Sequence, residues 1–118
     1  MTAPRSLTPQ QHRALVAEQM TESALQAQIL TAARTTGWLA YHTHDSRRSR
    51  PGFPDLVLVH DRRGLVLFRE LKTERGRVRP EQREWLSALA AAGADAGVWR
   101  PSDWLGERVI AELMGTPS

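Results

Sequence analysis

The sequence contains no cysteine, which excludes disulfides and thiolate metal sites and fits a reducing compartment. It also has no uncharged apolar run that is long enough to cross a membrane. Residues 1–11 lack the apolar segment of a secretory signal peptide. We therefore expect a cytoplasmic protein that does not associate with membranes.

Several catalytic and binding motifs are missing as well. There is no glycine-rich phosphate loop, no Ser/His/Asp pattern and no zinc finger. His42 and His44 have the i, i+2 spacing of a strand pair, but no third ligand has a spacing that suits zinc. We interpret both as polar residues of a strand edge or loop, and His44 stays a candidate for contact with DNA.

Lysine is nearly absent from this chain. Of its 16 basic residues only Lys72 is a lysine, and it lies two positions after Glu70. An ammonium group is a compact charge whose pKa shifts on burial, whereas a guanidinium is a planar fork that stays charged. A single lysine close to a glutamate therefore indicates a specific chemical role.

Arginine supplies the remaining positive charge and gathers in two predicted loops. The net charge is only +3, but local clustering attracts a polyanion more than the total does. Solvated loops are the alternative, and we favour contact with DNA phosphates. The clusters are Arg47, Arg48 and Arg50 in one loop, and Arg75, Arg77 and Arg79 in the other.

At 118 residues, the chain is long enough for one domain with a single core. Residues 1–20 are predicted to form an N-terminal helix or arm, and residues 21–118 the domain, although one continuous helix across this boundary stays possible. Periodicity, capping residues and turn residues predict the remaining elements. They are helices at about 9–20, 22–35, 80–92 and 102–114, the last capped by Ser102, and strands at about 38–44, 55–60, 65–71 and 96–99.

The strands predicted at 55–60 and 65–71 are apolar on both faces. Strands of this kind need cover on both sides, which the helices supply. The fold class is therefore α/β, with a small mixed sheet flanked by helices.

The turn between these strands decides whether Asp55 lies next to Glu70. A loop of two or four residues places them directly opposite each other, with Cβ atoms about 4.5–5.5 Å apart. A three-residue loop with a glycine bulge would place them on opposite faces. Lys72 shares a face with Glu70, because residues i and i+2 of a strand point the same way.

Two opposed carboxylates repel each other unless they share a proton or a cation. Such a pair suits Mg²⁺, which takes one or two protein carboxylates and keeps several waters. Lys72 would orient or help deprotonate a water and stabilise negative charge at phosphorus. The alternative is a surface Glu-Lys pair with an aspartate that caps a turn, and we favour metal-assisted hydrolysis of a phosphodiester.

Two polar residues lie on the predicted buried stripes of helices. Glu22 is in line with Leu25 and Ile29, and Gln82 is in line with Trp85 and Leu86. Each also has an ordinary explanation as a polar residue in the first turn of a helix. Together with the acidic pair, both are expected above the same end of the sheet.

Taken together, these stretches resemble the VRR-NUC domains, the virus-type replication-repair nucleases of the PD-(D/E)xK superfamily. The resemblance runs from about Glu22 to Trp99. Arg69 is a departure, because it stands where the family usually has an aliphatic residue. It would leave the far sheet face less buried or facing a partner. The stretches that carry the resemblance are Thr21 to Gln26, Gly52 to Leu56, Glu70 to Lys72 and Pro80 to Leu86.

The resemblance implies a restriction-endonuclease-like core of αβββαβ order. It implies that Asp55 and Glu70 bind Mg²⁺ or Mn²⁺, with Glu22 joining directly or through water. The backbone carbonyl of Leu71 is a further expected ligand. Lys72 would then be catalytic, and Gln82 would support the site.

Family members of this size are similar to phage and bacterial junction-resolving nucleases that work as homodimers. The resemblance thus implies a homodimeric, metal-dependent DNA endonuclease of DNA repair, in a bacterium or a phage-infected cell. Branched DNA such as a Holliday junction is one candidate substrate. A non-catalytic DNA-binding subunit on the same fold, or a module that binds proteins through its first helix, is the alternative.

Overall fold

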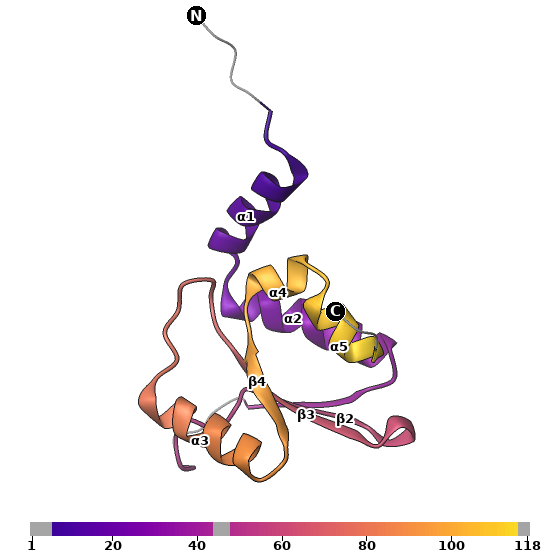
Figure 1. The fold of residues 1–118 in the computed structure, drawn as a ribbon, viewed down its shortest axis with the longest axis vertical. Helices are drawn as coiled ribbons and strands as arrows, with labels where there is room; N and C mark the ends of the chain where they lie inside the picture. Colours follow the sequence, from indigo (N-terminus) through magenta and orange to yellow (C-terminus); the bar gives the residue numbers. More distant parts are fainter. Residues whose placement is uncertain (1–5, 44–47, 116–118) are drawn as a thin grey trace, which may run out of the picture.

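The computed structural model describes residues 6–43 and 48–115. A four-stranded mixed sheet lies between helices, as predicted (Figure 1). No helix of the described residues is long and apolar enough to span a membrane. The elements are α1 (Pro9–Gln19), α2 (Glu22–Thr35), β1 (Leu39–His42), β2 (Leu56–His60), η1 (Asp61–Arg63), β3 (Leu65–Leu71), α3 (Pro80–Ala91), β4 (Asp95–Trp99), α4 (Pro101–Leu105) and α5 (Arg108–Met114).

The strands lie in the order β1-β2-β3-β4. β1 and β2 are antiparallel, as are β2 and β3, whereas β3 and β4 are parallel and connected through α3. The observed order of α2, three strands, α3 and β4 is the predicted αβββαβ order. Each observed boundary lies within two residues of its prediction up to β4.

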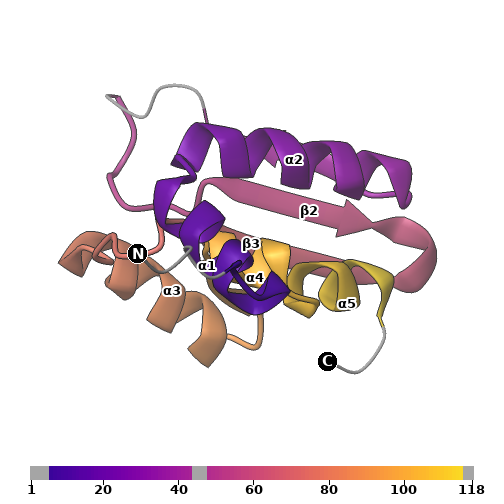
Figure 2. The same cartoon turned by 90° about the horizontal axis from the view of Figure 1, so that it is seen from above.

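One face of the sheet carries the hydrophobic core. The fully buried leucines Leu56 and Leu58 of β2 pack there against Leu25 and Ile29 of α2 and against Val109 of α5. Figure 2 shows α2 running along β2, with its first turn at the end of the sheet where β2 begins. The predicted helical cover is confirmed for this face.

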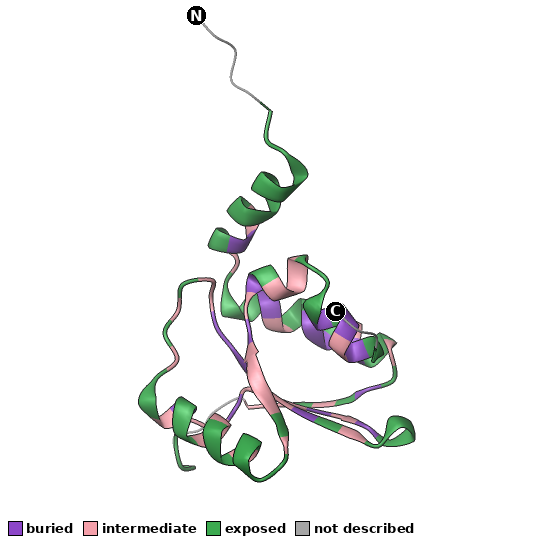
Figure 3. Ribbon diagram, viewed as in Figure 1, coloured by how far each residue is buried: buried purple, intermediate pink, exposed green. Residues whose placement is uncertain are grey.

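The other face of the sheet is covered only in part. α3 packs next to β4 on this side, and the face stays open over β1 and β2 (Figures 1 and 3). Leu39, Tyr41 and Val66 are exposed there, and Val57 and Val59 are half-buried. The prediction that helices cover both faces of the central strands is therefore wrong for this half of the sheet, because one 12-residue helix is too short to cover four strands.

The N-terminal helix and α2 are separate helices. Thr8 caps α1 by accepting a hydrogen bond from the Gln11 N–H, and Thr21 caps α2 by accepting one from the Ala24 N–H. Met20 has an extended backbone between them. α1 is mostly exposed and contacts α4 through its buried Ala17 (Figure 3). Whether residues 1–20 act as a separate arm stays a prediction, and residues 1–5 lie outside the described part.

The C-terminal helix differs from the prediction. Instead of one helix capped by Ser102, two short helices are present, α4 and α5, and Ser102 lies inside α4. Pro101 occupies the first helical position, and the Asp103 carboxylate accepts the Arg100 N–H at 2.8 Å. Gly106 then adopts an extended backbone that ends α4.

Arg69 is buried in the core face of the sheet, with 3% of its surface exposed. Its guanidinium donates to Asp95 at 2.8 Å and to Glu112 at 2.7 Å, and lies 5.0 Å from the centre of the Trp99 ring. The expectation that this charge leaves the face less buried is therefore wrong. Acidic residues of β4 and α5 compensate the charge inside the domain.

Candidate active site

A four-residue turn sets the register of β2 and β3. His60 pairs with Leu65, and η1 followed by Gly64 in the left-handed conformation (φ 64°) connects them. Leu56 is opposite Arg69, so Asp55 and Glu70 are the next residues along the two strands. The register predicted for a four-residue loop is confirmed, and the alternative with the two acids on opposite faces is excluded.

The two carboxyl groups are fixed by hydrogen bonds that cross between the strands. The Asp55 N–H donates to Glu70 Oε1 at 3.2 Å, and the Leu71 N–H donates to Asp55 Oδ2 at 2.8 Å. Each acid is therefore oriented by the backbone of the opposite strand. The position of each carboxylate depends on the strand pairing rather than on a flexible side chain.

Glu70 is buried, with 2% of its surface exposed, and its surroundings disfavour its negative charge. Burial raises its pKa to about 9, and the neighbouring Asp55 contributes to the rise. Lys72 opposes this effect, because its Nζ lies 4.0 Å from Glu70 Oε2. Glu70 therefore keeps its proton at neutral pH, although an ammonium group is nearby.

A cavity of about 460 Å³ opens beside the two acids. Asp55 and Glu70 form one part of its wall, and Gln82 and Trp85 of α3 form another. Tyr41 on the edge strand also faces this cavity. The site thus lies at the end of the sheet where β2 begins and β3 ends, on the face that α3 covers in part.

Gln82 reaches this cavity from the first turn of α3 and is 7% exposed. Its Oε1 accepts the Arg79 N–H at 2.9 Å, so its side chain also caps the helix. The prediction placed Gln82 above the end of the sheet that holds Asp55 and Glu70, and the structure brings the three together.

The loop before Asp55 contacts α3 at three points, through a hydrogen bond, an ion pair and a close backbone approach. The Trp85 indole donates to the Pro51 carbonyl at 3.1 Å, and Arg50 forms an ion pair with Glu84 at 2.5 Å. Gly52 has a φ of +97°, and a Cβ there would lie 2.4 Å from the Glu81 carbonyl oxygen. The sequence analysis missed this role of Gly52, although a Pro-Gly pair just before a strand is a recognisable turn signal.

Glu22 does not line the cavity. It is exposed in the first turn of α2, the helix that packs on the opposite face of the sheet. Among residues 6–43 and 48–115, no three His, Cys, Asp or Glu side chains are grouped closely enough to hold a metal ion. The described carboxylates at this site are therefore two, and a role for Glu22 stays a prediction.

The two acids fit a hard divalent cation. Carboxylate oxygens are the donors that Mg²⁺ and Mn²⁺ prefer, and one or two of them are enough when water and a phosphate complete the shell. Burial, followed by the neighbouring Asp55, raises the pKa of Glu70, and a bound cation would favour the ionised form of the acid instead. Zinc, which needs three or four nitrogen, sulfur or oxygen ligands from the protein, is a poor fit.

Two of the predicted arginines line the cavity, namely Arg50 from the loop before Asp55 and Arg79 at the start of α3. Arg48 is exposed, and Arg47 lies outside the described residues. The guanidinium of Arg50 also lies 5.8 Å from the centre of the Trp85 ring. One cation from each predicted cluster therefore faces the acidic pair.

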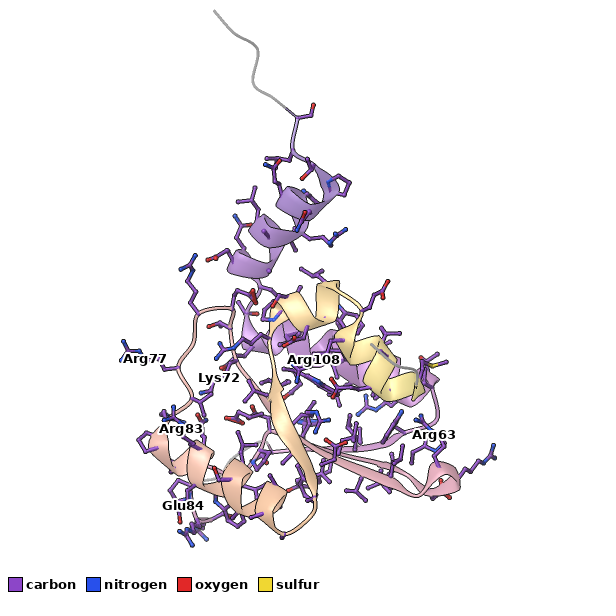
Figure 4. All side chains as sticks on the ribbon, in the orientation of Figure 1. Arg63, Lys72, Arg77, Arg83, Glu84 and Arg108 are labelled. Atoms are coloured by element: carbon purple, nitrogen blue, oxygen red, sulfur yellow. The ribbon has the colours of Figure 1, made fainter. Side chains whose placement is uncertain are left out.

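The second cluster surrounds a neighbouring hollow of about 660 Å³. Arg75 is bound to Glu18 of α1 at 2.8 Å, whereas Arg77 makes no ion pair within the described part of the chain. Figure 4 shows Arg77 and Arg83 on the same side of the molecule, on the loop after β3 and on α3. The hollow is lined by Arg75, Arg77, Arg79, Arg83 and Arg100, among others.

Arg100 holds the loop that carries this cluster. Its Nη1 donates to the carbonyl groups of Thr73, Glu74 and Gly76, at 2.8, 3.2 and 2.8 Å. The sequence analysis missed this residue, because the loop and the arginine are separated by 24–27 positions. No local sequence pattern predicts a contact between residues this far apart in the chain.

The histidine pair stays unassigned. His42 is the last residue of β1 and is half-buried, and His44 lies outside the described residues. His42 does not line the cavity of the acidic pair. A contact between His44 and DNA therefore stays a prediction.

Comparison with known proteins adds evidence of a different kind. A model of the VRR-NUC domain matches residues 4–103. A solved structure described as a VRR_NUC domain aligns with 71% of this chain and 88% of its own, with 25% identity and a TM-score of 0.61. A second, described as a VRR_NUC domain protein, aligns with 80% and 90%, with 18% identity and a TM-score of 0.55, which supports the fold alone. No curated protein matches the chain.

Proposed function

The chain belongs to the VRR-NUC family of nucleases, and from this premise we propose that it is a Mg²⁺- or Mn²⁺-dependent endonuclease acting on DNA. One observation carries the proposal beyond the family. Asp55 and Glu70 are held side by side in a cavity, and the pKa of Glu70 is raised to about 9. An acid in a cavity whose pKa is strongly shifted by burial and a neighbouring charged group is a candidate for a functional site.

Asp55 and Glu70 would hold the divalent ion, with the Leu71 carbonyl as a further ligand and Glu22 acting through water. The bound ion would polarise a phosphoryl oxygen and make water a stronger acid. Because the carboxylates are fixed by cross-strand hydrogen bonds, their orientation requires little reorganisation when the substrate binds. The rigid pair thus supports precise positioning of the scissile phosphate.

Lys72 is suited to the proton and charge handling of the reaction. Its side chain is 9% exposed, and its Nζ lies 4.0 Å from Glu70 Oε2 although Lys72 does not line the cavity, so a phosphate held by the acidic pair would lie near the ammonium. It would orient or help deprotonate the attacking water and stabilise negative charge on the phosphate oxygens. Gln82 would support the site by fixing the first turn of α3 against the cavity.

The arginines would bind the DNA backbone on both sides of the cut. Arg50 and Arg79 line the active cavity, and Arg75 and Arg77 extend the positive surface along the loop after β3. Arg47 and Arg48 belong to the same proposed surface. These contacts would supply affinity with steep salt dependence rather than sequence preference.

We further propose a homodimer that works in the cytoplasm on branched DNA, such as a Holliday junction. Cutting two strands of a junction requires two active sites, and a chain of 118 residues with this fold contributes one. Residues 1–20, which include the exposed helix α1, would serve as an arm. The role would be in DNA repair.

The test is a cleavage panel with linear duplex, flap and four-way-junction DNA, with Mg²⁺, Mn²⁺ or EDTA. We expect cleavage that needs the metal and is lost in Lys72→Met, a variant that keeps the apolar stem and removes the charge. If Asp55→Ala and Lys72→Met cleave as well as the wild-type protein, the active-site assignment is wrong. Salt-dependent binding without cleavage in either metal would instead favour a non-catalytic DNA-binding subunit.

A further inference from the structure

Tyr41 is the only tyrosine of the chain and is 63% exposed on the edge strand β1. It lines the cavity that contains Asp55 and Glu70. Within the described part of the chain its side chain makes no hydrogen bond, ion pair or ring contact. Strand propensity and the opposite Val57 favour an aromatic residue here, but no contact within the described residues covers its ring.

The pairing of β1 with β2 places Tyr41 close to the acidic pair. Tyr41 is directly opposite Val57, and the Thr43 N–H bonds to the Asp55 carbonyl at 3.1 Å, which continues the same register. Tyr41 and Asp55 are thus diagonal neighbours on one face, a relation that separates Cβ atoms by about 7–8 Å. A phosphate held at Asp55 would bring its own nucleotide within reach of the tyrosine ring.

The other aromatic side chains of the cavity are already engaged. Phe53 packs edge-to-face against Trp85, with ring centres 5.1 Å apart, and against Phe68 at 6.1 Å. Trp85 also lies below the Arg50 guanidinium. These rings form the wall of the cavity next to α3. The opposite wall comes from the edge strand, and among its described residues only Tyr41 has an aromatic ring that no other side chain covers.

We propose that Tyr41 is a stacking platform for an unpaired nucleobase next to the phosphate that is cut. This inference rests on the proposed DNA cleavage and specifies the substrate class. The site combines a free aromatic ring with the cations Arg50 and Arg79, which is how proteins bind single-stranded nucleic acid. Its volume of about 460 Å³ accepts more than a metal ion and a phosphate group.

A base inside a duplex cannot occupy this platform, because it is paired and stacked on both sides within the helix. A base at a branch point, flap or bulge has already lost much of this stacking, so little energy is needed to move it onto Tyr41. The preferred substrate is therefore DNA with an unpaired nucleotide at the cut. Continuous duplex is the disfavoured one.

The test uses flap DNA with 2-aminopurine at the unpaired nucleotide next to the branch. This base fluoresces when it is free and is quenched when it stacks on an aromatic ring. The protein is used with Ca²⁺ as the divalent ion, and a gel confirms that the strand stays intact. Binding itself is followed separately by fluorescence anisotropy of a label at the far end of the duplex.

We compare wild-type protein with Tyr41→Phe, which keeps the ring, and Tyr41→Leu, which keeps an apolar side chain without it. Wild type and Tyr41→Phe should quench the base, and Tyr41→Leu should not. In Mg²⁺, Tyr41→Leu should lose roughly tenfold in kcat/KM on the flap, the effect expected from the loss of one stacked base. Thermal unfolding should be unchanged, because the side chain is exposed.

Equal quenching by wild type and Tyr41→Leu, or no quenching by bound wild type, would overturn the proposal. A change from dimer to monomer in Tyr41→Leu with unaltered quenching would also overturn it. The exposed residues Leu39 and Tyr41 would then belong to a contact between copies of the chain. Quenching does not depend on cleavage. Loss of the proposed function would therefore appear as quenching without turnover, and failure of the inference as turnover without quenching.

Discussion

Arg69 and Glu70 are neighbours on β3 whose side chains point to opposite faces of the sheet, and both are almost completely buried. On the core face, Arg69 has two acidic partners, Asp95 and Glu112, at 2.8 and 2.7 Å. On the other face, Glu70 has a second acid beside it and a single ammonium group 4.0 Å away. The same strand thus buries one charged residue with its compensation and one acid whose charged form is disfavoured.

The two residues differ in whether the fold supplies partners for the charged form. Burial of an ion is tolerated when partners within the fold pair its charge, as Asp95 and Glu112 do for Arg69, although its Nε has no hydrogen-bond partner within the described residues. Glu70 instead has a pKa of about 9, so in the metal-free protein it keeps its proton at neutral pH. A buried acid in that state is suited to receive a cation that the chain does not supply.

The largest expected effect is on cleavage, and it differs between two aspartates. Asp55→Asn removes the ligand proposed for the divalent ion and should abolish DNA cleavage in Mg²⁺. Asp95→Asn changes the same chemical group in the Arg69 cluster and should leave kcat/KM within about threefold, because surface substitutions away from the site have small effects. Cleavage rates under identical conditions measure both, and equal losses would remove the distinction between the two regions.

The next largest effect concerns the free energy of unfolding, and it should differ between the neighbouring residues Arg69 and Glu70. Arg69→Met should lower the free energy of unfolding by about 2 kcal/mol, because hydrogen bonds to two charged partners are lost. Glu70→Gln should leave this free energy unchanged or raise it in EDTA at pH 8, because a buried acid with no cation is removed. Urea unfolding measures both values. A loss of stability in Glu70→Gln as large as in Arg69→Met would contradict the assignment.

The stability of the metal-free protein should also depend on pH through Glu70. Its pKa rises from 4.5 to about 9 on folding, so between these values the folded state binds a proton that the unfolded state has released. The free energy of unfolding should therefore fall as pH increases through this window, by at most about 1.4 kcal/mol per pH unit. Urea unfolding between pH 6 and pH 8.5 in EDTA tests this, and Glu70→Gln should show a flatter dependence.

Binding of a metal ion should release a proton for the same reason. At pH 7 the pKa of Glu70 keeps it protonated, and a carboxylate must lose its proton to become a ligand. Calorimetric titrations with Mn²⁺ in two buffers of different ionisation enthalpy should show release of up to about one proton per ion. Affinity should increase with pH up to about 9, and equal heats in the two buffers would count against a protonated Glu70.

The smallest expected effect concerns the arginine loop. Arg77→Gln should reduce the slope of log K against log salt concentration by about 0.9, the value for one lost phosphate contact on duplex DNA. Arg62→Gln, on the hairpin turn, is the matched control and should leave the slope unchanged. Arg63 is the neighbour of Arg62 on the same turn, and Figure 4 shows Arg63 and Arg77 on opposite sides of the molecule. Similar slopes for the two variants would mean that the loop after β3 does not contact the DNA backbone.

The predictable part of this molecule depends on local rules. The register of β2 and β3 follows from the length of the turn, and the turn residues Asp61 to Gly64 are visible in the sequence. The proximity of Asp55 and Glu70 follows from that register alone. The caps at Thr8 and Thr21 and the proline at the start of α3 are local signals as well.

The part that was not predictable depends on contacts between distant residues. The partners of Arg69 are 26 and 43 positions away, so its charge appeared exposed in the sequence although it is paired inside the domain. Glu22 has the right spacing for the buried stripe of α2, but spacing does not reveal that its first turn lies outside the cavity. Arg100 and the loop after β3 meet only through the folded chain.

Gly52 has a mechanical consequence for the nuclease. With no side chain between them, the backbone at Gly52 and the first turn of α3 touch directly, and neither can shift without displacing the other. Arg79 stands at the start of that turn, and Asp55 follows Gly52 by three residues. A larger residue at position 52 would therefore push apart the first turn of α3, which begins next to Arg79, and the segment that leads to Asp55, and would open the wall of the cavity between them.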